Sequence, residues 1–108
     1  MNSSGTLFQE YPAQIKAVRD YLRVTLPDAD LAESEDFDRD GIRFRLEPRR
    51  LIFISHEFLS DFTTQDAASR LRAWRVAEQA KSLSLGSMLL VTTDGTFVEN
   101  TQNNSLST

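Results

Sequence analysis

The chain contains no cysteine, and this absence removes several kinds of chemistry at once. Disulfide bonds, thiolate nucleophiles and zinc–thiolate sites all require cysteine. Histidine is nearly as scarce, because His56 is the only one. The four glycines form no glycine-rich loop of the kind that surrounds a nucleotide phosphate. We therefore expect no cofactor.

Long apolar runs and excess positive charge are also missing. Without a long apolar run we expect no membrane-spanning segment. The first residues, MNSSGTLFQEYP, lack a basic start followed by an apolar stretch, so a secretory signal is not expected. The net charge of −4 disfavours nucleic acid as the main partner, because phosphate binding needs a positive surface. These absences together favour a cytoplasmic protein that acts away from membranes.

The residues that are present fit a single small domain. Hydrophobic residues make up 40% of the 108-residue chain and charged residues 26%, as in ordinary globular proteins. Hydrophobic periodicity and end signals predict a frayed start over 1–7, a helix over 11–26 and three strands between 35 and 55. They then predict a short helix capped by Ser55, a long helix over 64–83 capped by Thr63 or Thr64, and strands over 87–93 and 96–99. This order predicts an α+β two-layer domain over 1–99: helix, three-stranded antiparallel meander, helix, then one or two strands. The polar residues 100–108 are interpreted as a disordered tail.

Residues 36–47, DFDRDGIRFRLE, match the pattern of an EF-hand calcium loop. Its ligands would be Asp36, Asp38, Asp40 and Glu47. An EF-hand needs a helix on each side of the loop, but Pro48 and the β-branched run after it exclude the exiting helix. Two arginines inside the loop would also repel the ion. We therefore reject calcium binding and expect no metal.

A β-hairpin explains the same residues better. Asp-Gly is a favoured two-residue turn, so Asp40–Gly41 is predicted at the tip. The predicted cross-strand neighbours are Asp38 with Arg43, Phe37 with Phe44, Asp36 with Arg45, Leu46 with Leu51, and Phe44 with Phe53. Opposite charges would meet on one face and aromatic rings on the other. One conflict remains: Glu33 and Glu35 would point inward unless the strand starts near Glu35 or bulges.

The sheet face opposite the phenylalanines is the predicted contact surface. If the helices cover the phenylalanine face, Ile52 and Ile54 lie on the other face beside Arg43 and Arg45. A small apolar patch with an arginine rim is typical of a protein contact. The sequence therefore predicts a small, acidic, non-enzymatic protein-interaction or regulatory domain whose partner is a protein, in the form of a homodimer.

Two other functions compete with this interpretation. His56 follows a predicted central strand, with Glu57 and Asp61 nearby, and a small enzyme or ligand-binding domain would use it as a general base. The structural interpretation is a helix start, with Ser55 as cap and Glu57 at the positive end of the dipole. Nucleic-acid binding would instead use the arginines of the meander and second helix, Arg43, Arg45, Arg70 and Arg75.

Two resemblances add to these expectations. The stretch IRFRLEPRRLIFISHEFLSDF, followed by an arginine-containing helix, resembles small bacterial proteins of no assigned function over less than half the chain. The shared step comprises Ile54, Ser55, Leu59, Asp61 and Phe62. It implies a bacterial cytoplasmic protein. Separately, the order of elements and the acidic charge are similar to type III secretion chaperones, which bind effector segments and are dimers.

Overall fold

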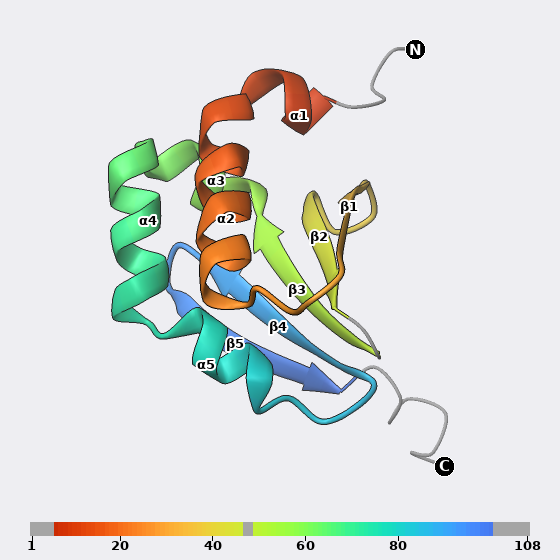
Figure 1. Cartoon of the computed structure of the whole chain (residues 1–108). Helices are drawn as coiled ribbons and strands as arrows, with labels where there is room; N and C mark the ends of the chain where they lie inside the picture. Colours follow the sequence, from red (N-terminus) through yellow and green to blue (C-terminus); the bar gives the residue numbers. More distant parts are fainter. Residues whose placement is uncertain (1–5, 47–48, 101–108) are drawn as a thin grey trace.

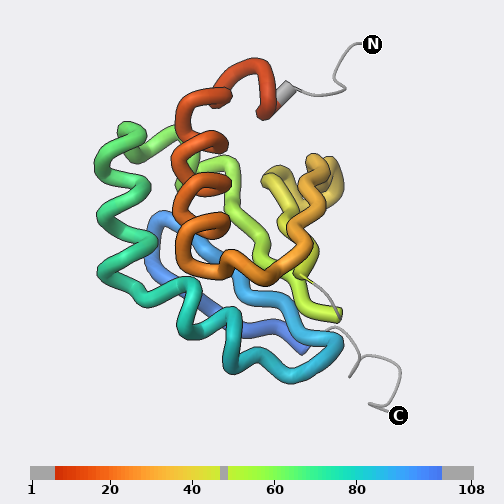
Figure 2. The backbone as a smooth tube through the Cα atoms, in the orientation of Figure 1, coloured from red at the N-terminus to blue at the C-terminus, as the bar shows by residue number. Residues whose placement is uncertain are grey.

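The computed structural model describes residues 6–46 and 49–100 (Figures 1 and 2). The elements in this part of the chain are α1 (Thr6–Glu10), α2 (Pro12–Thr25), β1 (Leu31–Asp36), β2 (Gly41–Leu46), β3 (Arg50–Ser55), α3 (His56–Asp61), α4 (Thr64–Ala73), α5 (Val76–Lys81), β4 (Ser87–Thr92) and β5 (Gly95–Asn100). Of the frayed start predicted over 1–7, residues 1–5 lie outside the described residues; so do Glu47 and residues 101–108 of the tail predicted over 100–108. Asn100 belongs to β5 rather than to a tail.

All five described strands form one sheet in the order β1-β2-β3-β4-β5. Strands β1 to β3 are an antiparallel meander, as predicted, and β4 pairs antiparallel with β5. Strand β4 runs parallel to β3, because helices α3 to α5 carry the chain back along the sheet before β4 begins. The α+β class is therefore confirmed, but the sheet is mixed.

The described helices lie against one face of the sheet (Figure 1). The buried apolar strand side chains of this inner face are Ile42, Phe44, Leu46, Ile52, Ile54, Leu89 and Val91. They meet the apolar stripe of α2, in which Ile15, Val18 and Leu22 are buried, and buried residues of α3, α4 and α5. One core therefore lies between two layers, and the opposite face of the sheet has no helix over it in the described structure.

The first hairpin turns earlier than predicted. Asp36 lies opposite Gly41, so Phe37–Asp40 form a four-residue loop and the predicted Asp40–Gly41 turn is wrong. Asp36 closes this loop, since its Oδ1 accepts the N–H groups of Asp38 and Arg39 at 3.1 Å each. Asp40 adopts the left-handed conformation, with φ of 61°. The predicted cross-strand pairs are therefore wrong: Arg43 lies opposite Ser34, Phe44 opposite Glu33 and Arg45 opposite Ala32.

The pairing of β2 with β3 is shifted by one residue from the prediction. Phe44 lies opposite Ile52, and Arg43 lies opposite Phe53. Because side chains alternate between faces, a shift of one residue moves Phe53 away from the face of Phe44. The predicted row of three phenylalanines does not form, and Ile52 and Ile54 are 0% exposed in the core.

Strand β1 starts earlier than predicted and includes two glutamates that point toward the helices, Glu33 and Glu35. Strand β1 begins at Leu31 rather than near Glu35. Glu33 Oε1 accepts a hydrogen bond from Arg19 of α2 at 2.8 Å. Glu35 Oε1 accepts the N–H of Leu7 at 3.3 Å, and Leu7 belongs to α1 although the sequence predicted fraying there. Both carboxylates are thus satisfied at the rim of the helix layer, and no bulge is needed.

Two helices, α4 and α5, take the place of the single helix predicted over 64–83. The predicted cap residues act as expected: Ser55 Oγ accepts the N–H of Phe58, and Thr63 Oγ1 accepts the N–H of Asp66, at 3.1 Å each. The single helix predicted over 64–83 is wrong, because Arg75 has a left-handed φ of 55° and separates α4 from α5. The break turns α5 across β3 and β4.

Candidate functional site

The outer face of the sheet, opposite the helices, carries the side chains that alternate with the core residues. By register these are Ala32, Ser34, Arg43, Arg45, Leu51, Phe53, Met88, Leu90, Phe97 and Glu99. Arg43 and Arg45 lie on this face, as the sequence predicted. Ile52 and Ile54 lie in the core on the helix side instead, so the prediction that they form the apolar part of a contact surface is wrong.

Most of the apolar middle of the outer face is covered by the chain's own side chains. Phe53 is 4% exposed and Met88 2%, although no described helix lies over them. Phe53 packs over Gly41, the one residue in β2 without a side chain. Arg39, in the β1–β2 loop, forms an ion pair with Glu99 of β5 at 2.9 Å, so their side chains reach across β3 and β4. The middle of this face is therefore not an open apolar patch.

Among the described strands, only β5 has large apolar side chains that are exposed. It is an edge strand, and its adjacent residues Phe97 and Val98 are 54% and 61% exposed. Phe97 lies on the outer face and Val98 on the helix side, by their pairing with Leu90 and Leu89. The strand has one charged residue, Glu99. An edge strand with a single charged residue and exposed large side chains offers both outward-pointing backbone groups and apolar contact area.

The other edge strand, β1, is chemically different. Its sequence LAESED carries three carboxylates. Charged residues on an edge strand oppose pairing with another chain. The two edges of the sheet therefore differ, and only β5 is suited to contact with a neutral or identical strand.

An arginine-lined groove of about 280 Å³ lies on the outer face beside β1. Arg43 and Arg45 form part of its wall, with Ser34 and Leu51. Arg43 donates a 2.7 Å hydrogen bond to Asp36 Oδ2, which compensates its charge. Burial alone would raise the pKa of Asp36, but the hydrogen bonds from Arg43 and from two backbone N–H groups outweigh it and lower the pKa below its ordinary value. At this groove, the charge of Arg43 is therefore already paired with Asp36.

His56 joins three separate parts of the chain. Its Nδ1 lies 3.0 Å from Asp40 Oδ2, and its Nε2 lies 3.2 Å from the Tyr11 hydroxyl. The nearby carboxylates named from the sequence are not its partners: Asp61 accepts a hydrogen bond from Thr93, and Glu57 is exposed on α3. A carboxylate–imidazole–hydroxyl series is an arrangement that can move a proton. Here both ring nitrogens already have partners, so the arrangement also serves to hold the β1–β2 loop to the start of α2.

Two carboxylates of the EF-hand pattern, those of Asp36 and Asp40, have separate partners. Asp36 binds Arg43, and Asp40 binds His56. Among the described residues, no group of three or more potential ligands is arranged to hold a metal ion.

The four arginines considered for nucleic-acid binding lie in different places. Arg43 and Arg45 are on the outer face of the sheet. Arg70 is in α4, where its guanidinium lies 5.3 Å from the centre of the Phe62 ring, and Arg75 separates α4 from α5. The structure does not bring these charges onto one surface.

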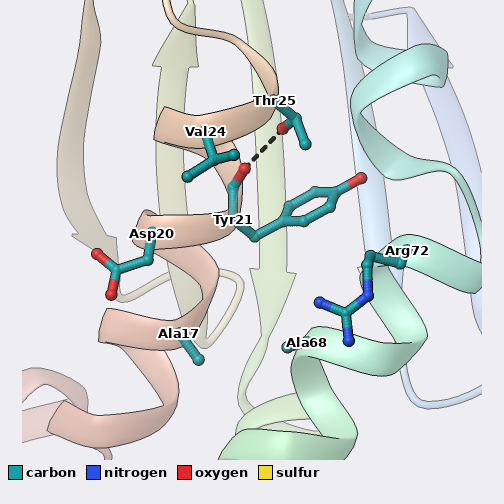
Figure 3. Close-up of a pocket in the computed structure, with 7 residues that line it drawn as sticks. All are labelled: Ala17, Asp20, Tyr21, Val24, Thr25, Ala68 and Arg72. Carbon is teal, nitrogen blue, oxygen red and sulfur yellow. Dashed lines mark hydrogen bonds between the residues drawn. The ribbon is translucent and has the colours of Figure 1, made fainter.

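A groove of about 360 Å³ between α2 and α4 was not anticipated from the sequence. Small residues, Ala17 and Ala68, line it, together with Val24, and Figure 3 shows the Tyr21 ring extending from α2 toward α4. The Tyr21 hydroxyl accepts the N–H of Ala77 at 3.0 Å, and burial raises the pKa of this tyrosine. The groove can take a small apolar group. The sequence signal for this groove was the presence of small residues, Ala17 and Ala68, on two helices that face each other.

Comparison with known proteins adds no family. No family model matches the chain, and searches find no matching curated protein and no matching solved structure. Within the described part of the chain, no helix has both the length and the apolar character needed to cross a membrane.

Proposed function

We propose that this chain is a small non-enzymatic protein-contact domain that forms a homodimer through strand β5. The observation that carries the proposal is the exposure of two adjacent large apolar side chains, Phe97 and Val98, on an edge strand. Exposed single apolar residues are common on protein surfaces, but here they lie on a strand at the edge of the described sheet. A partner strand would cover both kinds of group together.

A second copy of the chain is the partner that fits this edge best. An edge strand that pairs antiparallel with itself satisfies its own free N–H and C=O groups by symmetry. Self-pairing at β1 would bring carboxylates together, whereas β5 contributes only Glu99. Dimers would leave the outer face available for a further protein partner.

The solution mass from light scattering, measured over a range of concentrations, tests the proposal. The wild type should have twice the mass of one chain, and Phe97→Lys should be a folded monomer, because a charge on the contact strand opposes pairing. Val24→Lys is the matched control, since Val24 is 77% exposed but lies on α2. A monomeric wild type would refute the proposal, and a Phe97→Lys dimer would move the contact elsewhere.

A small enzyme or ligand-binding domain is the second candidate, and Asp40, His56 and Tyr11 are the observation that favours it. His56 is the only histidine, so its imidazole gives one resolved set of NMR signals. A small-molecule screen should leave these signals unchanged if the three side chains only hold the loop. Ligands that shift them, and lose affinity in His56→Ala, would support the second candidate.

A further inference from the structure

Resting on the proposed self-association, we infer that two copies pair β5 with β5 antiparallel in one particular register, with Phe97 opposite Phe97 of the second copy. The two five-stranded sheets then become one continuous sheet with both helix layers on the same side. The register follows from the face, charge and size of each residue in β5.

Symmetry limits the possible registers. In an antiparallel pair, residues directly opposite each other point to the same face. Phe97 and Glu99 lie on the outer face, and Thr96 and Val98 on the helix side. With a two-fold axis perpendicular to the sheet, one residue of β5 must lie opposite itself, and its neighbours pair symmetrically around it. The register is therefore named by its central residue.

Centring the pair on Phe97 gives favourable neighbours at every position. The two Phe97 rings meet on the outer face, and Thr96 lies opposite Val98 twice on the helix side. Aromatic pairs and β-branched pairs are the cross-strand contacts that stabilise sheets most. Glu99 lies opposite Gly95, which has no side chain and around which a Cβ would meet nothing within 4 Å. The ion pair of Glu99 with Arg39 is therefore left undisturbed.

The neighbouring registers are worse. Centring on Thr96 shortens the pair, because Val98 would lie opposite Asp94, which precedes β5. Centring on Glu99 places two carboxylates directly opposite each other, which is destabilising. Centring on Val98 places each Phe97 ring against Glu99, whose carboxylate is held by Arg39.

Space beside β5 permits the approach of a second strand. On the helix side, Val98 lines a cleft of about 250 Å³ together with Gln79 and Leu83. Gln79 Nε2 donates to Thr96 Oγ1 at 3.0 Å, which holds α5 beside the strand without covering Val98. Phe97 is exposed on the outer face. Both faces of the edge are thus accessible.

The absence of cysteine makes the register directly measurable by disulfide cross-linking. Phe97→Cys, Val98→Cys and the control Val24→Cys are each oxidised mildly and separated on non-reducing gels. Directly opposite residues lie about 4.5–5.5 Å apart between Cα atoms, which suits a disulfide. Phe97→Cys should therefore form covalent dimers much faster than the other two variants.

A mixture of Thr96→Cys and Val98→Cys leaves Phe97 intact and provides a second measurement. The inferred register predicts a cross-link between the two variants in the mixture and little within either alone. Fast cross-linking of Val98→Cys by itself would overturn the register. If the wild type is dimeric by light scattering but no β5 variant cross-links, the β5 contact is wrong although the dimer stands. A monomeric wild type would instead refute the proposed function itself.

Discussion

Replacing Gly41 with alanine should destabilise the domain by about 2–4 kcal/mol. A Cβ at this position would lie 2.4 Å from the Ile54 carbonyl oxygen and 2.4 Å from Cζ of Phe53. The oxygen belongs to the backbone of β3, so it can move only if the β2–β3 pairing distorts. The Phe53 ring could rotate away, but it is 4% exposed, and removing it from its site loses about 1.5–3 kcal/mol of apolar burial. Either response is costly, and strain adds about 1–3 kcal/mol.

Urea unfolding followed by the fluorescence of the single tryptophan, Trp74, measures this loss. In thermal unfolding, the melting temperature of a domain of this size should fall by about 10–20 °C. Ser34→Ala is the control, because Ser34 is an exposed residue on the same sheet face and its loss should change stability by less than about 0.5 kcal/mol. If Gly41→Ala unfolds at the wild-type urea concentration, Phe53 does not lie over Gly41 and the β2–β3 register is wrong.

Three further substitutions test the remaining features. Ile54→Asp should abolish folding, seen as loss of the circular dichroism signal, because it places an unpaired charge in the core; a folded variant would contradict the layer assignment. Asp36→Asn should cost about 1–3 kcal/mol at neutral pH. The folded-state pKa of Asp36 lies below its ordinary 3.8, so the stabilisation from its charged form is present above pH 3.8 and is lost as the pH falls through the folded-state pKa. The difference in unfolding free energy between the wild type and Asp36→Asn should therefore shrink below about pH 4. Glu33→Gln should cost about 0.5–2 kcal/mol in urea unfolding, because Arg19 then loses a half-buried charged partner, whereas Lys16→Gln, in an exposed pair, should change stability by less than about 0.5 kcal/mol.

Local signals in the sequence predicted local structure well. The apolar stripe and the prolines around it predicted α2 to within one or two residues. Ser55 was predicted as a cap, and Thr63 was one of two threonines predicted for the next cap, because a hydroxyl oxygen here reaches an N–H group only three residues ahead. Such interactions depend on neighbours in the chain and can be read from it.

Interactions between distant residues explain most of the errors. The glutamates of β1 argued for a later strand start, but their partners are Arg19 and the N–H of Leu7, 14 and 28 residues away from them. The break at Arg75 has no glycine or proline to mark it; the left-handed residue is an arginine. The partner of His56 is Asp40, which lies 16 residues before it and beyond a whole hairpin. Nothing in the local pattern selects these partners.

The error with the largest consequence for function is the placement of β3, and it comes from Gly41. The strand RLIFIS is apolar on both faces, so alternation cannot show which set faces the helices. Interpreting Asp40–Gly41 as a turn used the conformational freedom of glycine, whereas in the fold this glycine is needed because it has no side chain. Phe53 fills the space above it, so Ile54 goes to the core. The middle of the outer face is then closed by Phe53 and by the ion pair of Arg39 with Glu99, and the large apolar side chain that stays exposed on this face is Phe97, at the edge.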